Sequence, residues 1–560
     1  MKTGASSTRP NLRWRRWMRR GSWAALIAVA GWYAFALAVL HPIAQASVVD
    51  SWLYGAAVRR FLRSGEIRFA GFSQAMPAAQ ILYGAAWGRV CGAGSASLTL
   101  SIVPIAILCA VMFHALVRRC GAARWQAMAA TGLVVCNPCF LFLSFSFMTD
   151  LPFLAFLVGA LLAFANAKGQ RAARWLWIAA AVCVGGFLVR PFAGMAIAGC
   201  AGAILIDRCG IPGVQKPRRA TDWKRLAIEL APFAAALAVC AAIWIRLTVL
   251  GPKPWALQMS EGNFSQFFAV PIASYLRAGI LSPAIYLGTV MAPTALLQIA
   301  TPKRARIAII AAALFAAAIF LMRLDPSLPV TPEFSCFGGW SNVLILRGLP
   351  NRFLWNSEWQ YAFLALGCVG AAGLIVAATE IAPRLNRAAI AVTIAALVYW
   401  TATIPLWFFN DRYYLPLVPA AALIVARARL PRSRFVKGAA FAMTLAMGLM
   451  SLGGTYAYQR GLSAIVQARN SLEAEGVPRA KIDAGYEMNG EDLYRYPKEG
   501  IDTMQFEAGI PMITSAKLDE YTIAAAPIPG LKIIRTLEWP GMFGLGRRDL
   551  YVLKRPPPVP

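Results

Sequence analysis

Histidine is almost absent from this sequence, which holds only His41 and His114 among 560 residues. Cysteine occurs eleven times, and the single CxxC, at 136–139, lies within an apolar run, where a free cysteine behaves as a small hydrophobe. Structural and catalytic zinc sites are built from three or four such ligands at short spacings. The sequence therefore predicts no metal site and no cofactor, and a requirement for a divalent metal stays open.

Glycine-rich phosphate loops are missing as well. Neither a GxGxxG fingerprint nor a Walker-type GxxxxGK[ST] loop occurs in the chain. Such loops hold the phosphates of nucleotides through backbone N–H groups. The sequence therefore does not support the use of ATP or of a nucleotide-sugar.

Charge is scarce, and negative charge is scarcest. Charged residues make up 14% of the chain and hydrophobic residues 59%, a composition typical of a polytopic membrane protein. The 55 basic residues outnumber the 25 acidic ones and give a net charge of +30. They lie in short clusters between apolar runs, as the positive-inside rule requires. We therefore expect membrane lipids, and no nucleic acid, to contact the chain.

The first apolar run, at residues 22–40, follows the basic stretch NLRWRRWMRR. It is long enough to cross a bilayer. A cleaved signal peptide would need a small-residue site followed by a soluble mature domain, and none follows. We predict a transmembrane helix preceded by a basic cytoplasmic tail at 1–21, in a bacterial-type inner membrane.

The basic clusters also predict the number of spans. If every cluster is cytoplasmic, an even number of crossings must separate each pair. Thirteen apolar ranges satisfy this rule: 22–40, 97–117, 125–145, 151–167, 175–190, 192–206, 228–250, 279–300, 307–322, 359–379, 388–409, 413–427 and 436–457. The predicted bundle occupies 22–458, and the chain after it lies outside, in the periplasm.

The first external loop, predicted at 41–96, contains two helical patterns. Residues 51–63 repeat apolar side chains at helical spacing and carry three arginines largely on the other side, which predicts an amphipathic helix with its apolar face in the lipid boundary. The stretch PAAQILYGAAWGRVCG at 77–92 is apolar but short for a span. We predict that it also lies at the membrane surface.

Residues 459–560 differ from the rest in having charge of both signs. They contain the short apolar runs LKIIRTLEW and RDLYVLK and the turn signals Asn489-Gly490 and Pro529-Gly530, which predict a small α/β soluble domain. Further external segments are expected at about 251–278 and 323–358. The expected architecture is an all-α polytopic membrane bundle of about thirteen transmembrane helices, with surface helices in the first loop and this C-terminal domain.

Two aspartates stand at predicted helix starts. Asp50 directly precedes the helix at 51–63, and Asp150 precedes Pro152 in SFSFMTDLPFLAF. Either can be a helix cap, which is worth about 1 kcal/mol. Alternatively, Asp50 faces a cavity between the loop and the bundle, and Asp150 lies near the outer bundle surface, where an ionisable residue is a candidate for a functional site. Asp50 would then act as a base, and the two roles are compatible.

Arginines and aromatic residues recur near the same boundary. Arg412 and Tyr413 enter a predicted helix from its outer end, in FFNDRYYLPLVP. They form either an interfacial belt with a snorkelling arginine or a clamp for a lipid phosphate. Arg190 occupies an outer turn, where interfacial placement alone can explain it. Trp52 and Tyr54 are interfacial aromatics or line a sugar or acceptor pocket.

Together these stretches resemble the GT-C membrane glycosyltransferases, in particular the branch with the protein O-mannosyltransferases and the lipid A aminoarabinose transferases. The resemblance rests on Asp50 with WLYGAAVRRFLRSGEI, on PAAQILYGAAWGRVCG, on MTDLPFLAFLVGALLAF and on DRYYLPLVPAAALI. It covers the bundle to about residue 458. Many relatives carry paired acidic residues in the first loop, whereas this chain has Asp50 alone.

The resemblance implies transfer of a sugar from a polyprenyl-phosphate donor to a lipid, glycan or protein acceptor. Asp50 would deprotonate the acceptor hydroxyl, and Asp150 would orient the acceptor or an arginine. Arg412, with Tyr413 and with Arg190 or Arg59 of the first loop, would bind the donor and neutralise its phosphate. The alternatives are a transporter or flippase of lipid-linked envelope material and a non-catalytic assembly partner in which Asp50 is only a cap.

Overall fold

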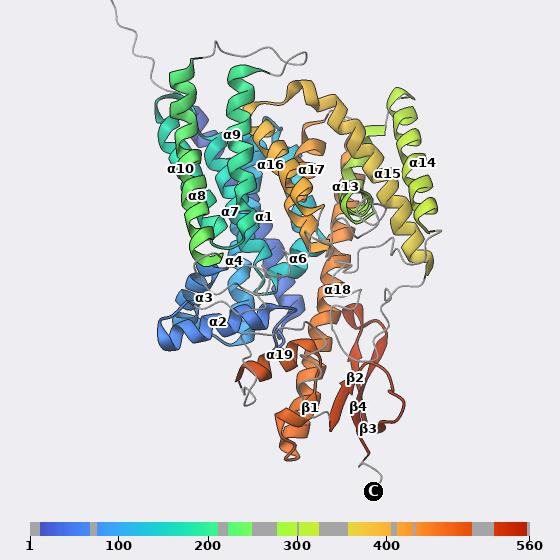
Figure 1. Ribbon diagram of the computed structural model, residues 1–560. Coiled ribbons are helices and arrows are strands. Elements are labelled where there is room, and N and C mark those ends of the chain that lie inside the picture. Colours follow the sequence, from blue (N-terminus) through green and yellow to red (C-terminus); the bar gives the residue numbers. More distant parts are fainter. Residues whose placement is uncertain are drawn as a thin grey trace, which may run out of the picture.

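A helical bundle forms most of the molecule, and a small β-sheet lies beyond one end of it (Figure 1). The computed structural model describes residues 12–67, 76–210, 222–248, 277–299, 302–323, 357–404, 411–428, 433–495 and 520–556. Most of the predicted external segments 251–278 and 323–358 lies outside these residues. The first eleven residues of the predicted tail 1–21 do as well.

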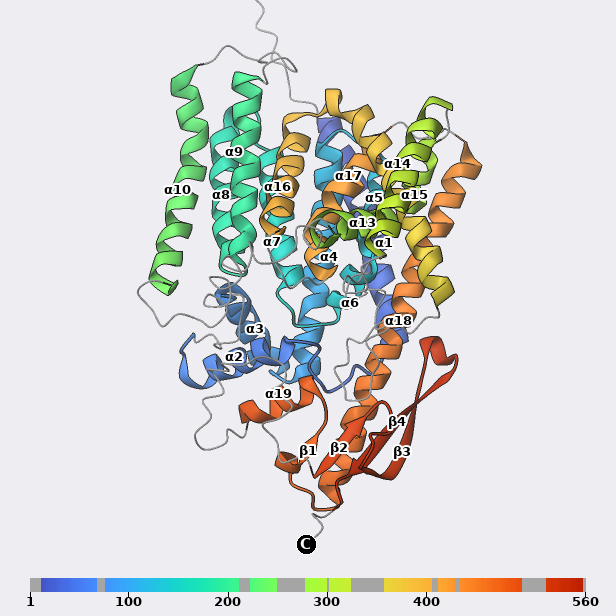
Figure 2. The same ribbon diagram turned by 45° about the vertical axis from the view of Figure 1, so that its right-hand side comes forward.

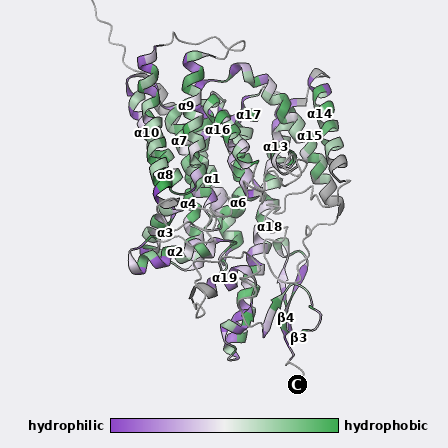
Figure 3. Cartoon of the chain, viewed as in Figure 1, coloured by the Kyte–Doolittle hydropathy of each residue, from purple (hydrophilic) through white to green (hydrophobic). Residues whose placement is uncertain are grey.

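Each of the thirteen predicted spans contains a helix. The bundle helices are α1 (Leu12–Leu40), α4 (Ser95–Arg119), α5 (Arg124–Val135), α6 (Pro138–Ser144), α7 (Asp150–Ala165), α8 (Ala172–Phe187), α9 (Gly194–Cys209), α10 (Trp223–Thr248), α13 (Ser282–Ala295), α14 (Pro302–Arg323), α15 (Ser357–Ile381), α16 (Arg387–Thr403), α17 (Val418–Arg427) and α18 (Arg434–Ala474). Hydrophobic residues run along them (Figure 3).

Seven helices within the described residues are long and apolar enough to cross a membrane, or eight if a bent pair counts as one span. The chain is therefore a multi-pass membrane protein. Helices such as α7, α16 and α17 are shorter than a bilayer requires on its own. The number thirteen consequently stays a prediction.

The bent pair is the predicted span 125–145, which is two helices and not one. Helices α5 and α6 meet at an angle of 65° around Asn137. Pro138 cannot donate a backbone hydrogen bond to continue α5, and the Asn137 side chain caps α6 by accepting from the Phe140 amide at 3.0 Å. The Asn–Pro pair therefore ends one helix and starts the next.

Helix α18 is longer than the predicted span at 436–457. It continues without a break to Ala474, over 41 residues. It therefore joins the bundle to the C-terminal segment as one continuous rod (Figure 2), and the predicted boundary between 458 and 459 falls within this helix. The strands β1 (Ile482–Asp483), β2 (Tyr521–Ala524), β3 (Lys532–Pro540) and β4 (Arg547–Lys554) form a sheet in the order β1-β2-β4-β3 beside it.

The predicted strand-forming runs are confirmed, since LKIIRTLEW and RDLYVLK supply β3 and β4, which pair antiparallel. Pro529-Gly530 does form a turn, in which Gly530 has a φ of +81°. The turn predicted at Asn489-Gly490 is wrong, because both residues lie inside helix α19 (Tyr486–Arg495). Gly490 is needed there for close packing, since a β-carbon would overlap the ring of Trp52.

Both helices predicted in the first loop are confirmed as α2 (Ser51–Ser64) and α3 (Ala78–Cys91). They lie at the same end of the bundle as α19 and the sheet (Figures 1 and 2). The prediction that α2 rests one apolar face on lipid is wrong for its first half. All residues from Ser51 to Val58 are buried, because α3, α4 and α19 pack around them.

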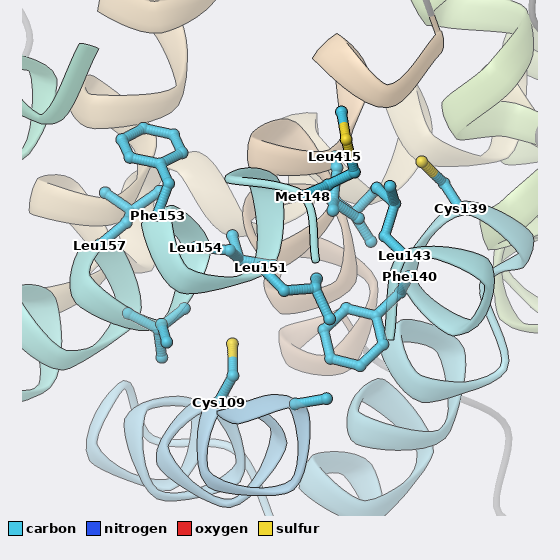
Figure 4. Packing of buried hydrophobic residues seen from close by; sticks show 14 of the residues in the cluster. Cys109, Cys139, Phe140, Leu143, Met148, Leu151, Phe153, Leu154, Leu157 and Leu415 are labelled. Atoms are coloured by element: carbon cyan, nitrogen blue, oxygen red, sulfur yellow. The ribbon is translucent and has the colours of Figure 1, made fainter. Parts of the chain in front are cut away.

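A continuous apolar core fixes the start of α7. Leu151 and Leu154 are fully buried, as are Cys109 of α4 and Phe140 of α6. Figure 4 shows these side chains gathered between the three helices. Close packing of this kind leaves little freedom for the backbone. The residue that precedes Leu151, Asp150, is therefore held in a defined place.

Candidate functional site

Asp50 is bound by residues from two distant parts of the chain. Its Oδ2 lies 3.1 Å from Nη2 of Arg412. Its Oδ1 accepts a hydrogen bond of 2.7 Å from the Tyr486 hydroxyl. The side chain makes no capping hydrogen bond to α2. The interpretation of Asp50 as a simple helix cap is therefore wrong, and its carboxylate is held by a cation and a neutral donor.

The backbone next to Asp50 is strained. Val49 has a φ of +49°, a conformation that is rare for a β-branched residue. The Ser51 amide donates to the Val48 carbonyl at 3.0 Å and closes the turn. Strain of this kind persists only where the surrounding structure imposes it, and it concentrates at functional sites. Val48 and Val49 are both buried and so supply that constraint.

Asp150 forms a second acid–base pair. It is the first residue of α7, after Thr149, and its Oδ2 lies 2.9 Å from Nη2 of Arg190. The Nε of Arg190 donates to the Thr149 hydroxyl at 2.6 Å. The Asp150 side chain is 2% exposed and that of Arg190 is 12% exposed. Asp150 is thus paired with an arginine, and the helix N-terminus favours its negative charge.

Arg412 lies in a 3₁₀ turn, Asp411–Leu417, ahead of α17. Its side chain is only 10% exposed, so it does not snorkel to water. The guanidinium carbon lies 5.5 Å from the centroid of the Tyr413 ring, within the range of a cation–π contact. Its Nε is buried and has no hydrogen-bond partner among the described residues. A buried donor of this kind calls for a partner.

The two pairs belong to one electrostatic group, which we call the carboxylate–guanidinium cluster: Asp50, Asp150, Arg190 and Arg412. Tyr54 interacts electrostatically with all four. Burial, and then the charge of Asp50, raise the pKa of Tyr54 to about 12, so its hydroxyl keeps a proton at neutral pH. The structure therefore brings together four residues that the sequence placed at four separate connections between predicted spans.

The other predicted site residues have different surroundings. Nη2 of Arg59 lies 3.7 Å from a carboxylate oxygen of Glu491, and its Nη1 donates to the Ala93 carbonyl. Trp52 is fully buried and meets the Tyr486 ring edge-on, at 6.0 Å between centroids. Trp52 therefore packs α2 against α19, and its place in a sugar or acceptor pocket stays a prediction.

Sequence reasoning missed the residues that complete the site. Tyr486 and Glu487 come from α19, more than 430 positions after Asp50, and no local pattern singles them out. Burial raises the pKa of Glu487 to about 8, and the Asp50 charge adds to this. The Tyr458 hydroxyl donates to Glu487 at 3.3 Å. Tyr399 of α16 also interacts with Asp150, Arg190 and Arg412; as a tyrosine within an apolar run it could have been noticed.

Within the residues that the structure describes, no group of three or more His, Cys, Asp and Glu side chains is arranged to hold a metal ion. The acid–base pairs instead join one carboxylate to one guanidinium. Such pairs can bind an anion through the guanidinium and accept a proton through the carboxylate. The cluster therefore has the groups for acid–base chemistry on a phosphate-bearing ligand.

Comparison with known proteins gives matches in structure alone. No family model and no curated protein sequence matches the chain. The fold is similar to ArnT from Cupriavidus metallidurans bound to undecaprenyl phosphate, at 17% identity and a TM-score of 0.41, over 94% of this chain and 97% of that one. It is also similar to the archaeal oligosaccharyltransferase AglB from Archaeoglobus fulgidus in complex with an inhibitory peptide and a dolichol-phosphate, at 15% identity and a TM-score of 0.40.

The AglB match covers 86% of this chain but 60% of the AglB chain, so the protein spans about three fifths of that relative's length. The apo form of the C. metallidurans ArnT matches over 95% of this chain and 98% of its own, at 15% identity and a TM-score of 0.41. Similarity of this degree leaves the activity to be argued from the residues themselves.

Proposed function

We propose that the protein is a membrane glycosyltransferase, which transfers a sugar from a polyprenyl-phosphate donor to an acceptor at the outer face of the membrane. The observation that carries this proposal is the pairing of Asp50 with Arg412 at the end of the bundle, 3.1 Å apart. A base and a phosphate-binding cation must lie side by side to deprotonate an acceptor while a phosphate departs. This pair meets that requirement.

The arginines suit a phosphate because a guanidinium offers several N–H donors in one plane. Arg412 gives one nitrogen to Asp50 and has a buried Nε without a partner among the described residues. Arg190, held by Asp150 and Thr149, supplies a second positive charge to the same cluster. The donor phosphate would bind Arg412 first and draw on Arg190 for further neutralisation.

The reaction is a single displacement. The acceptor hydroxyl attacks the anomeric carbon of the sugar, and its proton passes to Asp50. A new glycosidic C–O bond forms as the bond between the anomeric carbon and the phosphate oxygen breaks. The polyprenyl phosphate leaves with the electron pair, and the arginines stabilise its charge. With one base and no covalent intermediate, the configuration at the anomeric carbon is inverted.

The remaining parts have supporting roles in this proposal. Asp150 holds Arg190, and Tyr413 packs against the Arg412 guanidinium. Arg59, tied to Glu491, would contribute to the electrostatic attraction of the donor. The N-terminus would be cytoplasmic, and the segment 459–560 would be periplasmic in an inner membrane. The acceptor would be a lipid, a glycan or a protein.

The test is the release of polyprenyl phosphate from a panel of polyprenyl-phosphate sugars, with crude cell envelope as acceptor. We expect turnover by the wild type and a loss of roughly 10²–10⁴-fold in Asp50→Asn, as for removal of a general base. Asp549→Asn is the matched control, because Asp549 is an exposed carboxylate on strand β4 that accepts a hydrogen bond from a tyrosine. It should retain wild-type turnover.

Undiminished turnover in a folded Asp50→Asn variant would remove Asp50 from the chemistry. Absence of turnover with every donor, together with movement of lipid-linked sugar across proteoliposome membranes, would instead establish a flippase. The same purified samples serve both assays, so the two functions are separated directly.

A further inference from the structure

A side chain of the C-terminal segment, residues 459–560, contacts the carboxylate–guanidinium cluster. Tyr486, the first residue of α19, donates its hydroxyl hydrogen to Oδ1 of Asp50 at 2.7 Å. Arg412 binds the other oxygen, Oδ2. The Asp50 carboxylate is thus fixed at both oxygens, by a cation from the bundle and by a neutral donor from the C-terminal segment. A second contact of this kind determines which way the carboxylate faces.

Three further contacts hold α19 in this place. Gly490 lets the helix approach the Trp52 ring closely. Glu491 accepts a hydrogen bond of 3.2 Å from the Ser95 hydroxyl at the start of α4. The same carboxylate lies 3.7 Å from Arg59 of α2. These contacts bind α19 to the loop that carries Asp50, so the position of Tyr486 is set by packing and not by Asp50 alone.

The protonation states of two α19 residues allow this helix to donate a hydrogen bond to Asp50. Burial, together with the charge of Asp50, raises the pKa of Tyr486 well above its ordinary value, so the phenol keeps its proton. Burial raises the pKa of the adjacent Glu487 to about 8, so that carboxyl is mostly neutral at pH 7 and adds little negative charge beside Asp50. The helix therefore brings a hydrogen-bond donor to Asp50 without a strongly repelling neighbour.

We propose that Tyr486 is a positioning residue, which holds the Asp50 carboxylate oriented for proton transfer, so that the C-terminal segment is part of the reaction centre. The proposal rests on the proposed glycosyltransferase function and deepens it. Tyr486 acts through Asp50 and does not itself touch the reacting atoms. It would therefore change the rate of the chemical step more than the binding of the donor.

Several groups face Asp50, and the test must separate the effect of the Tyr486 hydroxyl from the effects of the others. Arg412 comes from the turn before α17, Tyr486 and Glu487 come from α19, and Tyr54 comes from α2. Asp150 and Arg190 form the rest of the cluster, and Tyr458 of α18 contacts Glu487. Changing Tyr486 to phenylalanine keeps the ring against Trp52 and removes the hydroxyl alone.

The experiment compares Tyr486→Phe with wild type in the full-length protein. The matched control is Tyr551→Phe, because Tyr551 also donates to an aspartate, Asp549, at 3.0 Å in the same segment but on its exposed face. A water-soluble carbodiimide with an amine labels protonated carboxyls between pH 5 and 8, and mass spectrometry measures Asp50 relative to the exposed Glu66. This measurement does not depend on any enzymatic activity.

We expect Asp50 in Tyr486→Phe to be labelled about tenfold more than in wild type at a given pH, since a hydrogen bond to its charged form is lost. The control should match wild type. With a donor that the wild type uses, kcat should fall about tenfold while KM changes less than about twofold. The acid limb of the kcat profile should move to higher pH, because the hydrogen bond to the carboxylate is lost.

Unchanged labelling of Asp50 in Tyr486→Phe would overturn the proposal, whatever the enzyme does. Increased labelling with unchanged kcat would overturn the role in proton transfer. If the wild type turns over no donor, the proposed function fails, and the labelling experiment still decides whether the Tyr486 hydroxyl acts on Asp50.

Discussion

Nη2 of Arg412 lies 3.1 Å from Oδ2 of Asp50, although 362 positions separate the two residues in the chain. The arginine side chain is 10% exposed and the aspartate 20%. Charges removed from water to this extent need a partner. A phosphate that binds Arg412 would compete with Asp50 for that guanidinium. In the proposed function, donor binding would loosen the pair and leave an Asp50 oxygen free to accept a proton.

Replacing Arg412 with lysine tests its role as a phosphate clamp. Arg412→Lys keeps the charge but loses the planar set of donors that binds phosphate through two bonds. We expect KM for the lipid-phosphate donor to rise roughly 10- to 100-fold, as for the loss of one hydrogen bond to a charged group. Steady-state kinetics over a range of donor concentrations measure this.

Arg547→Lys is the control, because Arg547 pairs with Glu538 and is 78% exposed. Its kinetics should match wild type. If KM in Arg412→Lys stayed at the wild-type value, the phosphate would have to bind elsewhere.

Removing Asp150 tests the second pair. Asp150→Ala leaves Arg190 largely buried and without its carboxylate partner. We expect the free energy of unfolding to fall by about 3 kcal/mol, as for other broken buried pairs. Denaturant unfolding in detergent, followed by tryptophan fluorescence, measures the change.

The same substitution at an exposed pair, Glu538→Ala, should change stability by less than about 0.5 kcal/mol. Equal effects in the two variants would mean that the Asp150 pair is not buried in the way described.

Glu487 predicts a specific pH dependence of stability. Burial raises its pKa from 4.5 to about 8 in the folded protein. Between these values the folded state holds a proton that the unfolded state has lost, so stability falls as pH rises from about 4.5 to 8 and then levels off. The glutamine side chain of Glu487→Gln cannot ionise, so this variant should lose the pH dependence. The total change in the free energy of unfolding that it removes is on the order of a few kcal/mol.

Unfolding curves at pH 5, 6, 7 and 8 measure the slope. Glu66→Gln is the comparison, because Glu66 is 69% exposed, and it should keep the wild-type slope. A slope in Glu487→Gln equal to that of wild type would show that Glu487 is already ionised at neutral pH.

Gly490→Ala tests how closely α19 packs against α2. A β-carbon at Gly490 would overlap the Trp52 ring, so we expect a loss of about 1–3 kcal/mol from overpacking. Gly438→Ala in α18 is the control, because nothing lies within 4 Å of a β-carbon there. Alanine at that helical position should be neutral or stabilising by up to about 1 kcal/mol. Similar stability in both variants would argue against close contact between α19 and α2.

Local sequence patterns predicted the helices and strands well where the hydrophobic pattern of a segment determines its secondary structure. Apolar runs located a helix in each expected range, and alternating runs located β3 and β4. The break at Asn137-Pro138 was missed although its signal is local, because the apolar run continues across it. Asn489-Gly490 carried a turn signal but lies within a helix, since packing against Trp52 requires a residue without a side chain there.

The sequence by itself determined that the chain crosses a membrane and where its helices run, because apolar segments in lipid must satisfy their own backbone hydrogen bonds. It also placed Asp50, Asp150, Arg190 and Arg412 near helix ends. Only the tertiary structure decided which carboxylate meets which arginine, and that Tyr486 joins them. Such pairing depends on how distant segments pack, and neither hydropathy nor local spacing records it.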